Sequence, residues 1–459
     1  MKHVRKHQVV SAVALFGLVQ AALSQQPPNI VQSDARENTA MGTGALQGGG
    51  DSYSNTAVGF HALFAGPVGA QCCGGNTAVG AETMVATTSG AANTGLGQAV
   101  LNANTTGNYN TATGDSAMLL NTTGSFNTAA GGFALRFNKT GEANTGDGFA
   151  ALDNNRSGSY NTASGYQALQ SNTTADYNAA FGSFALSSNT TGHHNTALGN
   201  ESLESNVTGS DNTAVGTDVL ESNTSGANNV ATGAAALFDN TIGNNNTAAG
   251  MGALRHNTTG SGNIAIGYYA GLNLTTGKNN IDIGNGGSPG ENGVIRIGNA
   301  SAQTSVYVAG VNSSHVTGAP VYVTSSGQLG VLASSERYKT AIASMQAASA
   351  KVYQLRPVSF HLGSDPSGPV QYGLVAEEVD PIYPELVIRD AQGAIQGVRY
   401  DELAPLLLNE VQQQQHVIDA QQEQMRGLQK QLSAIGEQNA AMQSALRKLQ
   451  AGSASAMDR

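Results

Sequence analysis

The sequence contains no tryptophan, and only 11% of its 459 residues are charged. Ordinary globular domains contain about 25% charged residues, so the composition is not that of an ordinary globular enzyme. Small residues fill the difference: 58 residues are glycine, and Ala, Gly, Ser, Thr and Asn dominate the first two thirds of the chain. Such a bias indicates either a disordered chain or a repeat fold, and the periodicity of the pattern decides between them.

Cysteine is also scarce, since it occurs only as the neighbours Cys72 and Cys73. Two adjacent cysteines provide neither a metal-ligand set nor a framework of disulfides. They are either an exposed pair, as free thiols or a vicinal disulfide, or a cross-link between the chains of an oligomer. The nine histidines are scattered, without a cluster of His, Asp and Glu. We therefore expect no metal, no cofactor and no enzyme that acts on an external substrate.

Positive charge is the minority, with 21 Lys and Arg against 31 Asp and Glu and a formal net charge of −10. Binding to nucleic acid needs a basic surface, so no nucleic-acid partner is expected. Long apolar runs are missing beyond the N-terminal segment. The sequence therefore predicts no membrane span in the mature chain and no membrane anchor of its own.

The N-terminal segment has the organisation of a secretory signal. Three of the first six residues are basic, and Val9–Leu23 is an apolar stretch. Ala22-Leu23-Ser24 places small residues where a signal peptidase requires them. We expect a signal peptide over residues 1–24, a linker over 25–37, and a secreted or cell-surface protein. An uncleaved membrane anchor is the alternative.

A block of the form Asn-Thr-Ala-x-Gly-x-x-Ala-Leu recurs fifteen times, with its first Asn at positions 38 to 280. The spacing is 17 residues except for one step of 21, whose extra residues fall in the loop of Cys72 and Cys73. Seventeen residues are too few for two packed helices, and turn clusters such as Asn104–Gly107 separate the blocks. The pattern predicts a β-solenoid, or β-roll, over residues 38–292.

Three positions of the block are nearly constant: Ala or Gly at the third, Gly at the fifth and usually Leu at the ninth. Small residues let neighbouring coils approach closely, and the Leu column supplies an apolar seam. Asparagine side chains stacked coil on coil are expected to form hydrogen-bonded ladders. Fifteen coils at about 4.8 Å each would give a rod roughly 70 Å long.

The last two blocks, Asn263–Gly267 and Asn280–Gly284, read Asn-Ile-x-Ile-Gly in outline. They resemble the heads of trimeric autotransporter adhesins, which are β-rolls in which three chains associate. Three functions of the array stay open at this stage. It is a spacer, an adhesive surface for a cell-surface glycan or matrix ligand, or an ice-binding surface formed by the Thr column.

The segment 293–333 is predicted to be a β-rich neck. Val294–Ile297 and Ser305–Val308 are rich in β-branched residues, which favours short strands. Val321–Val323 is followed by Ser325–Gly330, which has the composition of a hairpin turn leading into a further strand.

Ser334 and Lys339 mark the boundary between the neck and a different kind of sequence. A hydroxyl is a weak nucleophile until a base removes its proton, and a lysine serves as that base only when burial favours its neutral form. The five-residue spacing lets the two side chains face each other across a turn. The spacing is equally compatible with a helix that begins at Ser334 or Ser335 as N-cap, with Glu336 in its first turn.

Several motifs resemble the intramolecular chaperone domain of phage endosialidases and tail spikes. They are Ser334-Ser335-Glu336-Arg337-Tyr338-Lys339, Leu355-Arg356-Pro357-Val358-Ser359-Phe360, Gly373-Leu374-Val375-Ala376-Glu377-Glu378-Val379 and Tyr383-Pro384-Glu385-Leu386-Val387. The resemblance implies a small α+β domain over 334–406 that trimerises, assists folding of the fibre and cuts itself off. It implies Ser334 as nucleophile, Lys339 as base and Ala333–Ser334 as the scissile bond. Many members have Asp where this chain has Ser335, so a non-cleaving chaperone is the alternative.

The C-terminal segment 407–450 carries apolar residues at alternating steps of four and three, followed by a tail over 451–459 that is predicted to be disordered. Such a seam is typical of a coiled coil, and it favours a homotrimer together with the resemblance above. A lone amphipathic helix folded onto the module is the alternative. The seam consists of Leu407, Val411, Gln414, Ile418, Gln421, Met425, Leu428, Leu432, Ile435, Asn439, Met442, Leu446 and Leu449.

Overall fold

The chain folds into two compact units, Met1–Tyr307 and Val308–Arg459. The computed structural model describes residues 32–48, 52–65, 74–309, 320–324, 327–331, 333–390 and 392–457. The predicted signal peptide and the pair Cys72 and Cys73 lie outside these ranges.

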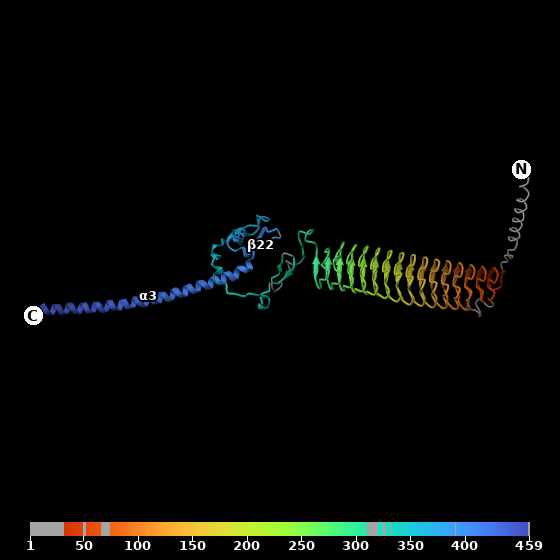
Figure 1. Ribbon diagram of the computed structural model, residues 1–459, viewed down its shortest axis with the longest axis horizontal. Helices are drawn as coiled ribbons and strands as arrows, with labels where there is room; N and C mark the ends of the chain where they lie inside the picture. Colours follow the sequence, from red (N-terminus) through yellow and green to blue (C-terminus); the bar gives the residue numbers. More distant parts are fainter. Residues whose placement is uncertain are drawn as a thin grey trace, which may run out of the picture. The chain divides into compact units, whose positions relative to one another are not determined.

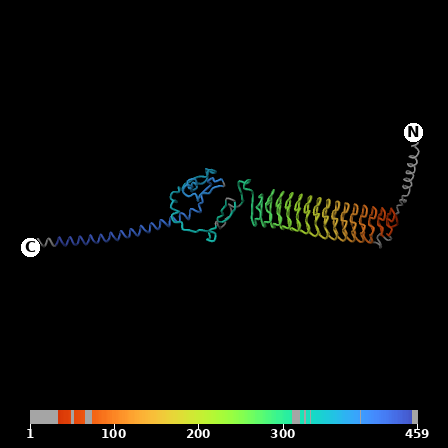
Figure 2. Tube along the Cα trace, viewed as in Figure 1, coloured from red at the N-terminus to blue at the C-terminus, as the bar shows by residue number. Residues whose placement is uncertain are grey.

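The first unit is a solenoid of short parallel strands, one from each block, which stack in a single sheet (Figures 1 and 2). Partners in neighbouring strands are 17 residues apart, as in Thr196 and Thr213, except at the one longer step, where Thr56 pairs with Thr77. The predicted fold class is therefore confirmed. The strands are β2 Thr39–Met41, β3 Thr56–Val58, β4 Thr77–Val79, β5 Thr94–Leu96, β6 Thr111–Thr113, β7 Thr128–Ala130, β8 Thr145–Asp147, β9 Thr162–Ser164, β10 Ala179–Phe181, β11 Thr196–Leu198, β12 Thr213–Val215, β13 Val230–Thr232, β14 Thr247–Ala249, β15 Ile264–Ile266 and β16 Ile281–Ile283.

The sheet extends past both ends of the repeat array. β1 (Gln32–Ser33) pairs antiparallel with β2, inside the segment predicted to be a linker. β17 (Ile295–Ile297) continues the parallel ladder from β16 after a step of 14 residues, inside the segment predicted to be the neck.

From β3 to β16, alternation along the strand places the middle residue of each strand in the core. Ala163, at the third position of its block, has no exposed surface, whereas its neighbours Thr162 and Ser164 are half-buried. Leu169, at the ninth position, is also fully buried, and its backbone is left-handed with φ 51°. The stacked alanines and leucines form one continuous apolar core along the solenoid.

The fifth position needs glycine for two reasons. Gly165 has φ +143°, a conformation that other residues rarely adopt. A Cβ atom at this residue would lie 2.3 Å from the carbonyl oxygen of Gly182 in the next coil. Glycine therefore permits the close approach of successive backbones, as the sequence predicts.

A ladder of buried asparagines runs through the first block position, as predicted. The Nδ2 group of Asn127 donates to Oδ1 of Asn110 at 3.1 Å and to the carbonyl of Gly141 at 2.9 Å. Its Oδ1 accepts from both the backbone N–H and Nδ2 of Asn144, at 2.9 and 3.1 Å. Each amide thus bonds the coil before it and the coil after it, without access to water.

A second asparagine ladder runs parallel to the first and was not predicted. Nδ2 of Asn138 donates to Oδ1 of Asn121 at 2.8 Å and to the carbonyl of Gly141 at 3.1 Å. Gly141 therefore accepts from both ladders, since Asn127 donates to the same oxygen. The sequence shows these residues only as the first position of turn clusters, and turn chemistry alone accounts for an asparagine there.

The last full coil departs from the pattern, because Asp282 occupies the third position, where Ala or Gly stands elsewhere. The side chain is fully buried, and neither carboxylate oxygen has a hydrogen-bond partner within the described part of the chain. Burial raises the pKa of Asp282 to about 6; the nearby Glu291 adds to the shift and Arg296 opposes it. Arg296 hydrogen bonds Glu291 instead, at 2.7 Å, which lowers the pKa of that carboxyl.

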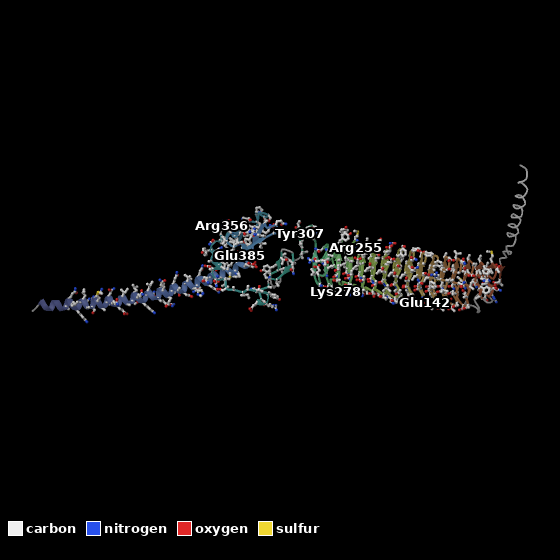
Figure 3. The ribbon with its side chains drawn as sticks, viewed as in Figure 1. Glu142, Arg255, Lys278, Tyr307, Arg356 and Glu385 are labelled. Atoms are coloured by element: carbon white, nitrogen blue, oxygen red, sulfur yellow. The ribbon has the colours of Figure 1, made fainter. Side chains whose placement is uncertain are left out.

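The neck is only partly as predicted. β18 (Tyr322–Val323) and β19 (Leu329–Gly330) form the expected antiparallel hairpin. The predicted strand at Ser305–Val308 is wrong: these residues form no strand, and Tyr307 is 93% exposed (Figure 3). A β-branched stretch forms a strand only where a neighbouring strand can pair with it.

The rest of the second unit is a small α+β module followed by a long helix (Figure 1). No helix of the described ranges has both the length and the apolar character needed to span a membrane. The buried core of the module consists of Val379, Tyr383, Leu386, Val387, Val398 and Leu406. Its elements are η2 Glu336–Tyr338, η3 Gln346–Ser349, η4 Val352–Gln354, β20 Val358–Phe360, β21 Gln371–Gly373, α2 Ala376–Val379, η5 Pro384–Leu386, β22 Val387–Arg389, β23 Ile395–Val398 and α3 Tyr400–Met457.

Removal of a single amide from the asparagine ladder is predicted to lower the free energy of unfolding strongly. Asn127→Ala removes four side-chain hydrogen bonds and leaves the buried N–H of Asn144 without an acceptor, so we expect a loss of about 3 kcal/mol in the free energy of unfolding. Thr128→Ala, at the exposed next residue, should cost less than about 0.5 kcal/mol. Urea denaturation of the full chain measures both variants. Equal effects at the two residues would show that the ladder does not stabilise the solenoid.

Substitution of Asp282 is predicted to raise the free energy of unfolding by an amount that depends on pH. A folded pKa of about 6 against an ordinary value near 4 means that the charged form destabilises the coil by roughly 3 kcal/mol above pH 6. The penalty fades as the pH falls and is nearly gone at pH 4, where the carboxyl is protonated in the folded state and about half protonated in the unfolded state. Asp282→Ala should therefore stabilise the protein by more at pH 8 than at pH 4, as measured by urea denaturation.

Asp147→Ala, at an exposed aspartate of β8, is the matched control for the Asp282 variant. Asp147→Ala leaves Asp282, Glu291 and Arg296 in place, so it measures the effect of removing an exposed aspartate alone. A gain that is the same at pH 4 and pH 8 would contradict the assignment of the pH dependence to Asp282.

Candidate functional site

Ser334 and Lys339 are brought together by one turn of 3-10 helix. η2 reverses the chain between them, and the backbone N–H of Lys339 donates to the carbonyl of Glu336 at 2.9 Å. Nζ of Lys339 then lies 3.3 Å from Oγ of Ser334, within hydrogen-bond reach. The spacing in the sequence permits this contact, and the geometry of η2 provides it.

The N-cap interpretation of these serines finds little support in the geometry. Ser335 occupies the N-cap position of η2, but its side chain makes no capping hydrogen bond. The hydroxyl of Ser334 faces Lys339 rather than the backbone N–H groups of the turn. Ala333, the residue before the proposed nucleophile, is exposed, as are Ser334 and Lys339.

The motif residues further along the chain support the module rather than this pair. Arg356, which lies two residues before β20 (Figure 3), forms a two-pronged ion pair with Glu378 of helix α2. The hydrogen bond from Arg356 lowers the pKa of Glu378. Tyr383 is buried, which raises its pKa, and its hydroxyl donates to the carbonyl of Ala348 at 3.1 Å.

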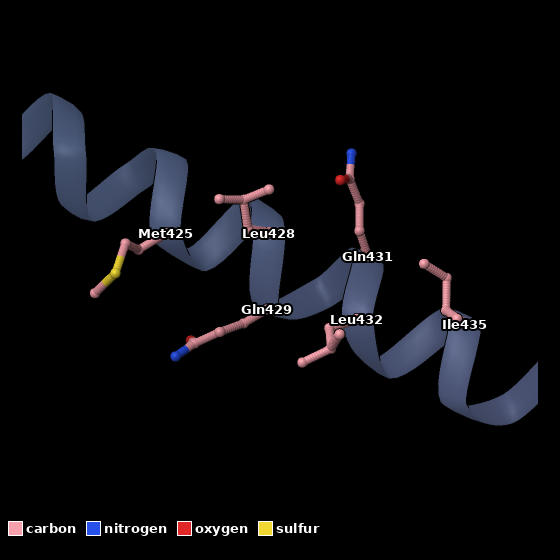
Figure 4. Close-up of a pocket in the computed structure, with 6 residues that line it drawn as sticks. All are labelled: Met425, Leu428, Gln429, Gln431, Leu432 and Ile435. Carbon is pink, nitrogen blue, oxygen red and sulfur yellow. The ribbon is translucent and has the colours of Figure 1, made fainter.

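Helix α3 is anchored to the module near its N-terminal end. Nδ2 of Asn409 donates to the carbonyl of Gln346 at 2.8 Å and to the hydroxyl of Ser349 at 2.6 Å. Beyond these contacts the predicted seam faces solvent: 61% of Met425, 57% of Leu428 and 72% of Leu432 are exposed. Figure 4 shows these side chains projecting from a single helix, together with Gln429, Gln431 and Ile435, which line a shallow depression.

A second exposed apolar surface lies at the C-terminal end of the solenoid. It is a grid of two isoleucines from each of β15, β16 and β17, which we call the isoleucine patch. Ile264, Ile281 and Ile295 pair in register in one column, and five of the six side chains are exposed by more than a third. This surface was not predicted from the sequence, although the Ile-x-Ile alternation in three successive strands is a sufficient signal for it. The six residues are Ile264, Ile266, Ile281, Ile283, Ile295 and Ile297.

One acidic group has the geometry to hold a metal ion within the described residues. Single carboxylate oxygens of Glu201, Glu204 and Glu221 lie within 4.8 Å of one another, on half-buried side chains. Burial raises the pKa of Glu204 and of Glu221, and neighbouring carboxylates add to both shifts. Acidic side chains often gather in this way without an ion, and no further feature marks this group as a ligand site.

Comparison with known proteins identifies part of the second unit. No curated protein matches the chain. The family model described as chaperone of endosialidase matches residues 334–388, so the match begins at Ser334 and includes Lys339. The chain therefore carries a domain of the endosialidase-chaperone family, placed C-terminal to a β-solenoid.

Proposed function

We propose that this protein is a secreted, homotrimeric, adhesin-like fibre whose C-terminal domain acts as an intramolecular trimerisation chaperone and then cuts the chain between Ala333 and Ser334. The observation that carries the proposal is the 3.3 Å contact between Lys339 Nζ and Ser334 Oγ at the first residues of the chaperone domain. The matched family is named among the peptidases, which fits a cut made by the domain itself.

Two exposed surfaces support association of the chain with copies of itself. The α3 seam presents a continuous row of apolar side chains to water, and so does the isoleucine patch. Contiguous exposed apolar surfaces of this kind are rare in monomers and mark interfaces. A heptad seam is covered when two or three helices of the same sequence wrap around each other.

The cut requires only groups of the chain and one water molecule. Oγ of Ser334 attacks the carbonyl carbon of Ala333, while neutral Lys339 takes the hydroxyl proton and delivers it to the departing amide nitrogen of Ser334. An ester then joins Ala333 to Ser334 Oγ, and water hydrolyses it. The products are a fibre that ends in the carboxylate of Ala333 and a released module that begins with the free amine of Ser334.

The exposure of the pair explains why the cut would wait for assembly. A lysine acts as a base only where it is shielded from water, and Lys339 is exposed in the single chain. Association of three chains would bring further surfaces to the module and cover the pair. The cut would then report that the trimer has formed.

The solenoid gives a reason for such a chaperone. Each coil resembles every other coil, so chains can associate out of register. A trimeriser at the C-terminal end fixes both the number of chains and their register. Its removal afterwards takes away the path for disassembly, which makes the fibre kinetically stable.

A permanently intact adhesin is the second candidate, in which the module and α3 only hold three chains together. The exposure of Ser334 and Lys339 favours it, and so does Ser335 in the position of the family's usual Asp. In both proposals the solenoid is the part that meets a cell-surface glycan or matrix ligand.

Substitution of the nucleophile separates the two candidates. Ser334→Ala should abolish release of the C-terminal fragment, because the hydroxyl that attacks Ala333 is gone, and Lys339→Met should slow release at least 100-fold. Ser335→Ala is the matched control and should cut as the wild type does. Denaturing gels and intact-mass analysis of the purified chains measure the outcome. A wild-type chain that stays whole, or a Ser334→Ala chain that splits at Ala333, would refute self-processing.

We predict that association of three chains through the α3 seam precedes cleavage at Ala333. Leu432→Glu places a charge on the apolar face of α3, so we expect fewer trimers and slower release of the module. Ser433→Glu, one residue along and off the seam, should leave both unchanged. Analytical ultracentrifugation and a time course of cleavage test the pair. Normal trimers and normal cleavage in the Leu432 variant would show that the seam does not drive assembly.

A further inference from the structure

A ladder of aromatic rings runs along part of the solenoid, at the residue directly before the first asparagine in five of the six successive blocks from Tyr109 to His194. Tyr109 stacks on Phe126 with ring centroids 5.3 Å apart and planes 7° from parallel. Further along, Tyr160 stacks on Tyr177 at 5.0 Å and 4°, and Tyr177 stacks on the His194 ring at 5.3 Å and 15°. These side chains are more than half exposed, so the ladder lies on the surface.

The ladder has one missing ring, at Ala143 between Phe126 and Tyr160. Ala143 has the same left-handed backbone as its neighbours in the column, with φ 53° against 60° and 59°. Because the coils repeat in register and neighbouring rings of this column lie 5.0 to 5.3 Å apart, we expect the rings of Phe126 and Tyr160 to lie about 10 Å apart, on either side of position 143. One further ring at the usual step would complete the stack. The side chain of alanine leaves that position open, and we call it the ring slot.

We propose that the ring slot binds a neutral pyranose unit of a glycan. A pyranose ring is flat enough to occupy one step, and its C–H groups meet the negative faces of the aromatic rings on both sides. Glu142, the residue before Ala143 in the sequence, is exposed on the solenoid (Figure 3), and we expect its carboxylate to be within reach of the hydroxyl groups of such a sugar. No described residue hydrogen bonds the carboxylate of Glu142, so that group is free to accept from a sugar hydroxyl.

Charge decides between the ring-shaped ligands that would fit. A nucleobase also stacks between aromatic rings, but its phosphates would meet an acidic chain of net charge −10. The carboxylate of Glu142 beside the slot disfavours acidic sugars for the same reason. A neutral sugar is not repelled by the negative charge, and its hydroxyl groups can donate hydrogen bonds to the same carboxylate.

This inference rests on the proposed function for its biological role, since a secreted fibre would use the slot to hold a cell-surface glycan. The slot itself belongs to the solenoid alone. It is formed by three successive coils, and it requires neither the cut at Ala333 nor the helix α3.

The decisive variant fills the slot. Ala143→Tyr should fold normally, because tyrosine occupies the same backbone conformation at positions 160 and 177, and the completed stack should raise the melting temperature. Binding of neutral oligosaccharides should fall at least tenfold. The probes are cellohexaose, maltohexaose and mannohexaose, measured by isothermal titration and saturation-transfer NMR. Ala92→Tyr, which has φ 53° and extends the ladder beyond Tyr109, adds a ring without filling the slot and should bind as the wild type does.

The titrations either support or overturn sugar binding at the ring slot. Wild-type binding to at least one probe, kept by Ala92→Tyr and lost by Ala143→Tyr, supports the slot. No binding of any probe by the wild type, or equal binding by both tyrosine variants, overturns it, as does binding of indole in place of every saccharide. All titrations are repeated on the uncut Ser334→Ala chain, and oligomeric state is measured in parallel. Sugar binding by the Ser334→Ala chain is expected, because the slot does not need the cut. A wild-type chain that binds sugar but stays monomeric and whole would refute the proposed assembly and cut and leave the slot intact.

Discussion

The buried asparagine ladder is the interaction on which the solenoid depends. Asn127 bonds the coil before it and the coil after it, and a second ladder shares the carbonyl of Gly141 with it. Each amide is satisfied only by its neighbours, so a coil is stable only within a stack. The ladder therefore stabilises the stack, but it does not determine at which coil the stack begins or ends. Asp282, buried without a partner, interrupts the regular core at the C-terminal end.

Because the solenoid is repetitive, its assembly needs a separate domain that sets the register. A stack that accepts any coil next to any other cannot set the number of chains or their register. The second unit is not repetitive: it has its own core and a long helix with an uncovered seam. Such a helix can pair with copies of itself in one register. The isoleucine patch marks the end of the solenoid that is nearest to that unit in sequence. A temporary guide in the second unit and a permanent contact at the patch would together build a fibre that no longer needs the guide.

Much of the fold could be predicted because a constant period fixes which residues lie above one another. The strands, the buried alanines and leucines and the first ladder all follow from the 17-residue step. The second ladder was missed because turn chemistry already explains an asparagine at that position. The strand at Ser305–Val308 was wrong because propensity does not supply a pairing partner. Ser334 and Lys339 could be nominated from the family resemblance, but only the turn of η2 brings their side chains within 3.3 Å.

The mass of the released head in its native state tests the central claim most directly. The account predicts that the fragment ending at Ala333, separated from its module after cleavage, remains an assembly of three chains because the isoleucine patches cover one another. Native mass spectrometry of that fragment distinguishes three chains from one. A fragment that leaves the module as a single chain would contradict the account, since the chaperone would then have fixed an assembly that the fibre cannot keep.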